Sequence, residues 1–422
     1  MATKKKEEKK EEIKEELNEK NSLGSLIELI IIILAFIIVL IFFKGTVIWN
    51  IATLLLILSI LIFVHELGHF IMAKLFGVHV YEFAIGMGPL VYSFRRKNDP
   101  TLYSLRALPI GGFNSIAGES YEDDDKLPKD KMMCNKPKWQ RLLILVAGVT
   151  MNFITAFILL FFIALVNGSS EQKSIIGTIE NDSPAAQAGL VVGDEILEMN
   201  GHKVDSWFEL TVAGLLKYDS DTYKYVIKHQ DGSIQTYEIK PVLSVQDRNG
   251  HSWDVTEENT VEKIVKDNNL KKKEYEETKT IGIRGSSELR YGVKNALNYM
   301  HVRFWDITKS MYTIIGSLFT GKLSLDALSG PVGMYSVVDQ AAKVGFANLI
   351  YLMAYLSINL GVMNILPFPA FDGGHVLFIL IELVTRRKVN EKFESMCHLI
   401  GFILIFALMI FITYKDILKL FG

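Results

Sequence analysis

The feature that most constrains this chain is the apolar run ILSILIFVHELGHFIMAKLFG, which contains His65, Glu66 and His69 within little more than one helical turn. A polar or charged side chain in a membrane-spanning helix costs roughly 2.5 to 3.5 kcal/mol even on lenient insertion scales. Three such groups side by side therefore need a compensating partner elsewhere in the chain.

The composition indicates a membrane protein. Of the 422 residues, 50% are hydrophobic, and they gather in blocks rather than being spread evenly. The formal net charge of −2 indicates no nucleic-acid partner. The two cysteines, Cys134 and Cys397, lie far apart, so neither a disulfide framework nor a cysteine zinc site is expected.

Residues 1–25 form a charged tail of mainly Lys, Glu and Asn, which is expected to be solvated. Five apolar stretches then predict membrane spans: an extra N-terminal span at 26–43, followed by four core spans at 51–76, 142–166, 346–371 and 397–414. Lys and Arg are concentrated in the tail, in residues 77–141 and in TRRK. Because such residues are retained on the cytoplasmic side, the N-terminus is predicted to be cytoplasmic and the polar region of residues 167–345 to lie outside the plasma membrane.

The outer region begins with IIGTIENDSPAAQAGLVVGDEILEMNG, which predicts short strands and a short helix and resembles a PDZ domain, assigned to residues 167–289. Such a domain can take an extended peptide as an added strand, or it can act only as a steric screen. Residues 244–280 predict a polar, flexible insertion. Apolar positions recur every three or four residues from Val293, which predicts an amphipathic helix within an outer-surface region of residues 290–345. This helix could lie on the outer membrane surface or pack on the neighbouring domain.

The HELGH sequence places two His four residues apart on one face of a helix, where both can bind one metal ion, with Glu66 close enough to meet a water on that ion. A catalytic zinc needs a third protein ligand. The segment NILPFPAFDGGH offers Asp372, which ends an apolar span interrupted by prolines. Alternatively, the His pair could be satisfied by helix packing, and Asp372 could be an ordinary helix cap.

The motifs HELGHF, PIGGF, AGVTMNF, GPVGM and NILPFPAFDGGH, in this order around the PDZ-like region, resemble the site-2 protease family of intramembrane zinc metalloproteases. The similarity is to its bacterial, PDZ-containing branch of the regulator of sigma-E protease type. The resemblance implies zinc ligation by His65, His69 and Asp372, with Glu66 as the general base. It also implies that Asn364 contacts the substrate backbone. Asn152 would line the same cavity, although either amide could instead join helices.

The expected fold is a polytopic α-helical membrane protein with four core transmembrane helices and one extra N-terminal span. The protease core would consist of residues 51–166 and 346–422, with an extracytoplasmic α+β PDZ-like domain between its halves. The segment LVYSFRRKNDPTLYSLRAL predicts two short strands around an Asn98-Asp99-Pro100 turn. In the family, this cytoplasmic-side, membrane-associated β-hairpin or sheet holds the substrate extended.

The resemblance implies an endopeptidase that cuts single-span membrane proteins in or near their transmembrane segments, with anti-sigma factors or signal-peptide remnants as substrates. A non-proteolytic adaptor or chaperone that binds peptides through the PDZ-like domain is the alternative. The presence of Glu66 favours the protease, because a structural zinc site has no use for a base. A metal-dependent transporter is disfavoured by the single compact group of ligands. The sequence leaves the oligomeric state open.

Overall fold

The computed structural model describes residues 31, 34, 36–39, 41–119, 127–170, 172–218, 220–247, 252–255, 260–270, 275–286, 288–325, 328 and 330–421. The predicted charged tail and much of the predicted extra span at 26–43 lie outside these residues. The chain divides into two compact units, one made of residues 1–159 with 328–422 and the other of residues 160–327. The two HELGH histidines and Asp372 therefore belong to the same unit.

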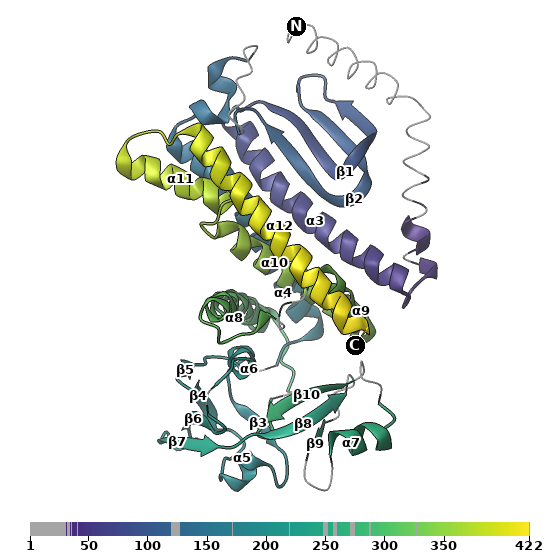
Figure 1. Cartoon of the computed structure of the whole chain (residues 1–422), viewed down its shortest axis with the longest axis vertical. Helices are drawn as coiled ribbons and strands as arrows, with labels where there is room; N and C mark the ends of the chain where they lie inside the picture. The colour runs from purple at the N-terminus through teal and green to yellow at the C-terminus, as the bar shows by residue number, and fades with distance from the viewer. Residues whose placement is uncertain are drawn as a thin grey trace. The chain divides into compact units, whose positions relative to one another are not determined.

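The first unit is built mainly from helices (Figure 1). They are α3 (Val47–Leu75), the greater part of α4 (Lys138–Asn167), α9 (Pro331–Val344), α10 (Phe346–Ile365), α11 (Asp372–Thr385) and α12 (Glu391–Phe421), with two short 3₁₀ turns at Lys129–Lys131 and Met133–Asn135. Among the described residues, four helices are long and apolar enough to cross a membrane: Val47–Leu75, Lys138–Asn167, Phe346–Ile365 and Lys392–Leu418. They agree with the four predicted core spans and with a membrane protein.

The predicted span at 346–371 is wrong at its C-terminal end. Helix α10 already ends at Ile365, and Asp372 is the first residue of the separate helix α11 rather than the end of a span. Two prolines lie in the intervening loop, where they remove the N–H groups that would continue the helix. Gly373 is required here, because a Cβ at this position would overlap the carbonyl oxygens of Ile365 and Leu366. The loop therefore folds back tightly over the start of α11.

A two-stranded sheet of β1 (Val80–Arg95) and β2 (Leu102–Ile116) packs against α3 (Figure 1). The strands are longer than the two short ones predicted. Residues 82–85 pair with both 112–115 and 102–105, so the ribbon folds on itself. Gly86 and Gly111, with φ of 83° and 69°, allow these bends. Phe83 anchors the sheet to α3, with its ring centroid 4.6 Å from that of Phe70.

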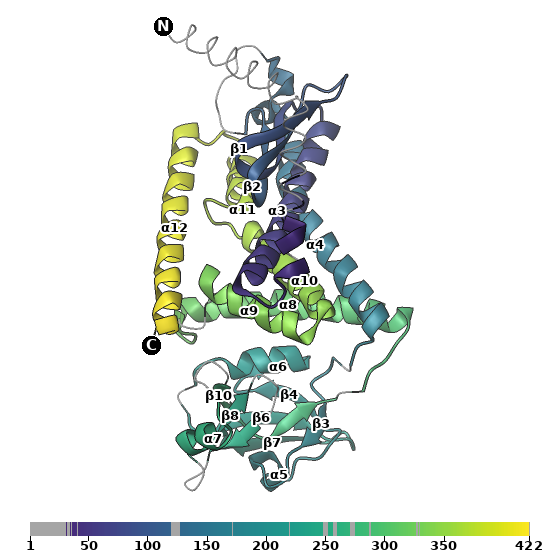
Figure 2. The ribbon, with the colours of Figure 1, turned by 90° about the vertical axis from the view of Figure 1, so that its right-hand side faces the viewer.

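The C-terminal end of α12 is fixed to the start of α9 (Figure 2). Asp416 Oδ2 accepts hydrogen bonds from the backbone N–H groups of Gly330 and Gly333, both at 2.8 Å. A carboxylate at a helix N-terminus satisfies otherwise unpaired N–H groups and is favoured by the helix dipole. Helix α9 in turn packs through Val338 against Leu54 of α3 and Leu352 of α10. These contacts join α12 and α10, through α9, to α3, the helix that carries the HELGH segment.

The second unit contains three small sheets. Among its described residues, the strand orders of these sheets are β5-β4-β6-β7, β10-β8-β9 and β11-β3. The strands are β3 (Ile176–Ile179), β4 (Glu195–Met199), β5 (His202–Lys203), β6 (Tyr223–Lys228), β7 (Ile234–Ile239), β8 (Val242–Asp247), β9 (Ser252–Asp254), β10 (Tyr275–Thr280) and β11 (Ile283–Gly285). The helices are α5 (Pro184–Gln187), α6 (Trp207–Gly214), α7 (Val261–Asp267) and α8 (Val293–Phe319). Ile176, Ile196 and Ile227 lie at the centre of its hydrophobic core.

Two sequence predictions can be compared with this unit. The amphipathic helix predicted from Val293 is present as α8. The flexible insertion predicted at residues 244–280 is wrong for the described part of that segment. Those residues form α7 and most of the sheet β10-β8-β9, in which Thr278 pairs with Ser244 and Asp254 pairs with Ser244 from the other side. The β8–β10 pairing joins residues that are about thirty positions apart in the sequence. A local sequence pattern therefore cannot predict it.

Candidate metal centre

Helix α3 holds His65 and His69 on one buried face. Each residue is 7% exposed. Their Nε2 atoms lie 3.1 Å apart, and the two rings meet edge-on, with centroids 4.8 Å apart and planes at 81°. The spacing of four residues explains this proximity, since residues i and i+4 of a helix lie above one another. The two Nε2 atoms therefore converge on one point.

Asp372 brings a carboxylate to the same point from the first residue of α11. Its Oδ2 lies 3.0 Å from His65 Nε2 and 3.4 Å from His69 Nε2. This oxygen is buried, and no donor is aligned to form a hydrogen bond with it. Ligand atoms on a tetrahedral zinc, with bonds of about 2.0–2.1 Å, are about 3.3 Å apart. The three observed separations match that value. Two imidazoles and a carboxylate are also a usual ligand set for catalytic zinc, so the residues present fit this ion.

Two glycines let α3 and α4 approach closely enough to hold the imidazoles. A Cβ on Gly148 of α4 would overlap His69 Nε2 and lie 2.8 Å from His65 Cε1, and a Cβ on Gly68 of α3 would overlap the carbonyl oxygen of Ala147. The sequence analysis did not identify either glycine as part of the site. Gly148 could have been identified as a small residue inside the apolar AGVTMNF segment, because small residues mark close helix contacts in membranes.

The second ring nitrogen of each histidine has its own partner on α4. His69 Nδ1 lies 2.8 Å from the carbonyl oxygen of Ile144. A carbonyl can only accept a hydrogen bond, so Nδ1 carries the proton and Nε2 keeps a lone pair for a metal. His65 Nδ1 lies 3.1 Å from the amide of Asn152, which is completely buried. The structure thus brings Asn152 to the cluster, as a neighbour of a histidine.

Glu66 and Asn364 are placed differently. Glu66 directly follows His65, is partly buried, and lies three residues before His69, which puts it next to the converging Nε2 atoms along the helix. Asn364 lies in the last turn of α10 and is partly exposed. No hydrogen bond joins it to His65, His69 or Asp372, all of which are described residues. Its predicted contact with the substrate backbone remains a prediction.

A second group of possible metal ligands, His375, Glu394 and His398, has a geometry that does not suit a metal. The two imidazole rings stack, with centroids 3.8 Å apart and planes at 18°, so their in-plane lone pairs do not converge. His398 Nδ1 already accepts a hydrogen bond from the N–H of Ala370 at 3.2 Å. The proton of the neutral ring is then on Nε2, which leaves no lone pair for an ion.

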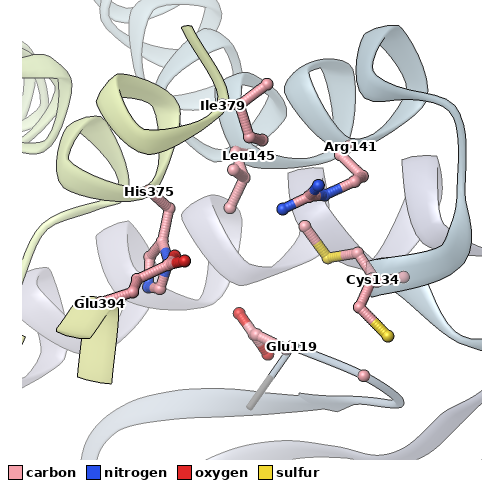
Figure 3. A pocket seen from close by; sticks show the side chains of 9 residues that line it. Glu119, Cys134, Arg141, Leu145, His375, Ile379 and Glu394 are labelled. Carbon is pink, nitrogen blue, oxygen red and sulfur yellow. The ribbon is translucent and has the colours of Figure 1, made fainter. Parts of the chain in front are cut away.

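This second group instead supports the loop that carries Asp372. His375 Nδ1 lies 3.1 Å from Glu394 Oε1, which links α11 to α12. Ala370, the partner of His398, adopts a φ of 88°, an uncommon value for a residue with a side chain. Figure 3 shows His375 and Glu394 beside a cavity that Glu119, Cys134 and Arg141 also line. We infer that His375, Glu394 and His398 form a hydrogen-bonded support. His65, His69 and Asp372 are then the candidate metal centre.

Comparisons with known proteins agree with this chemistry. A model of peptidase family M50 matches residues 53–408. A Fusobacterium nucleatum protein named as a zinc metalloprotease is 38% identical over 370 residues, which cover 86% of this chain and 97% of that protein. Regulator of sigma-W protease RasP of Bacillus subtilis is 31% identical over 445 residues, covering 87% of this chain and 98% of its own.

One solved structure is also similar in part. It is the PDZ domain of an SdrC-like protein from Listeria innocua, which matches 28% of this chain and 99% of its own at 22% identity, with a TM-score of 0.18.

The close approach at Gly148 predicts the effect of one methyl group. Gly148→Ala should displace the imidazoles and reduce the zinc content of the purified protein well below about one ion per chain. Elsewhere in a helix the same change is worth about 1 kcal/mol of stabilisation. Gly316→Ala in α8 is the matched control, because a Cβ there meets open space. Full zinc retention in Gly148→Ala, measured by elemental analysis, would contradict the packing argument.

Proposed function

Because this chain belongs to peptidase family M50, the site-2 protease family, and is a zinc metalloendopeptidase, we propose a specific reaction for it. It hydrolyses peptide bonds in or near the transmembrane segment of single-span membrane proteins. The observation that carries the proposal is the convergence of His65, His69 and Asp372 within a unit made of membrane-length apolar helices. Such a centre acts at the level of the membrane because its ligands come from those helices and the loop between them.

The proposed chemistry uses His65, His69 and Asp372 as the zinc ligands and Glu66 as the general base. When bound, zinc supplies Lewis acidity, which polarises a carbonyl group and lowers the pKa of water. Glu66 takes a proton from the attacking water and later gives it to the nitrogen of the leaving amine. Asn364, near the end of α10, would hold the substrate backbone by its amide group. Its partly exposed position leaves that amide accessible to a substrate.

A transmembrane helix must unwind locally before it can be cut, because its peptide bonds are shielded and its freed N–H and C=O groups need partners. The sheet of β1 and β2 packs on α3 and has edges that could pair with an extended segment. We propose that it holds the substrate extended. The PDZ-like region of residues 167–289 would select or screen substrates outside the membrane.

The substrate class is suggested by a relative. The name of the Bacillus subtilis protein states that it regulates sigma-W. Membrane-bound anti-sigma factors are therefore proposed substrates, and signal-peptide remnants are a second class implied by the family resemblance. A substrate that crosses the membrane once would suit a site that must admit a single unwound segment.

The proposed orientation places the N-terminus in the cytoplasm and residues 167–345 outside the plasma membrane, as the distribution of Lys and Arg suggests. In a chain with Cys134 and Cys397 replaced by Ala, a cysteine at Asp231 should react with a membrane-impermeant thiol reagent in intact cells. A cysteine at Arg387 should react only after the cells are opened. Both positions are exposed in the structure. The reverse labelling pattern would overturn this orientation.

The role of Glu66 can be tested separately from zinc binding. Glu66→Gln keeps the size and hydrogen-bonding capacity of the side chain but removes the base, so zinc should remain bound while cleavage slows by about a hundredfold or more. The assay is cleavage of a single-span model substrate in detergent, with zinc measured on the same sample. Asp372→Ala is the comparison, because it should lose zinc as well as activity. Cleavage by Glu66→Gln at the original rate would show that another group is the base.

A further inference from the structure

Asn152 occupies a fixed position between three helices. It is completely buried, and its backbone carbonyl accepts a hydrogen bond of 2.8 Å from Ser357 Oγ of α10. One residue further along α4, the ring of Phe153 lies so close to Gly361 of α10 that a Cβ there would overlap it. The amide of Asn152 faces His65 Nδ1 of α3 at 3.1 Å. Helix α10 thus holds this turn of α4 in place against the metal centre.

Zinc binding restricts the protonation of His65. To bind the ion through Nε2, the atom that faces His69 and Asp372, the ring must keep a lone pair there. A neutral imidazole then carries its proton on Nδ1. A buried N–H group needs an acceptor, and in the described part of the chain the amide of Asn152 is the group placed to provide it.

The two ends of this amide are not used equally. With Nδ2 towards His65, the buried Oδ1 of Asn152 has no hydrogen-bond partner. The oxygen and nitrogen of an amide are distinguished by their hydrogen-bond network rather than by their shape. Turning the amide over presents Oδ1 to the N–H of His65, which then leaves three lone-pair atoms facing one point, on His65, His69 and Asp372.

We propose that Asn152 is a positioning residue for zinc, whose side-chain oxygen accepts the hydrogen bond from His65 Nδ1; this rests on the metal centre of the proposed function. With the nitrogen turned towards His65, the ring would carry its proton on Nε2, which faces His69 Nε2 at 3.1 Å and Asp372 Oδ2 at 3.0 Å, and no lone pair would remain there for an ion. The orientation of one amide thus separates a ring that can bind zinc from one that cannot. The role differs from lining the substrate cavity.

Three substitutions separate the oxygen from the nitrogen. Asn152→Asp offers only acceptors at neutral pH, so zinc affinity should be kept within about threefold or improve, because a carboxylate behind a zinc-bound histidine is a common arrangement. Asn152→Leu has nearly the same size and no acceptor, and Asn152→Ala leaves a gap. Both should weaken zinc binding by about 10- to 100-fold, the usual effect of losing such a partner.

The measurement is the zinc dissociation constant of the purified full chain, obtained by competition with a chelator. Thr155→Val is the matched control on α4, since among the described residues the Thr155 hydroxyl bonds only to the carbonyl of Met151 in its own helix. Affinity lowered equally in Asn152→Asp and Asn152→Leu would overturn the proposal, and so would unchanged affinity in Asn152→Leu. His65→Ala tests the metal centre itself: unchanged zinc binding there would contradict the proposed function, whatever the Asn152 variants do.

Discussion

The structure depends on the burial of three electron-pair donors, two imidazoles and a carboxylate, at one point among apolar helices. Without a cation between them, such groups are costly in a membrane protein, and with one they become the ligands of a strong site. Three glycines allow the surrounding helices and loop to bring these donors together. Gly68 and Gly148 let α3 and α4 meet at the two histidines, and Gly373 lets the loop before α11 fold so that Asp372 arrives from another direction.

The convergence of His65 and His69 was predictable from the sequence because a spacing of four residues on one helix is a local feature, and Asp372 was a candidate for the third ligand. Two histidines four residues apart must share a helix face, and Asp372 is the only acidic residue between Asp339 and Glu382. The path of the chain around Asp372 was not predictable in the same way. The prolines were interpreted as an interruption within one span, whereas they lie in a loop between α10 and the separate helix α11. In residues 244–280, strand pairing over about thirty residues decided the outcome rather than local composition.

Roles of polar residues are harder to predict than their presence. Asn152 was a candidate either for lining the substrate cavity or for joining helices, and the structure puts its amide against His65. The same limit applies to the two groups of potential ligands. Both contain two histidines and an acidic residue. The edge-on rings of His65 and His69 differ from the stacked rings of His375 and His398, and His398 Nδ1 already accepts a hydrogen bond from Ala370. Composition carries no information on ring orientation.

The most direct test of this account is anomalous diffraction from crystals of the purified, zinc-containing protein, recorded on both sides of the zinc absorption edge. The account predicts one strong zinc peak per chain between His65 Nε2, His69 Nε2 and Asp372 Oδ2, with no peak at His375, Glu394 and His398. A peak at the second group, or a zinc held by only two of the three predicted ligands, would contradict it.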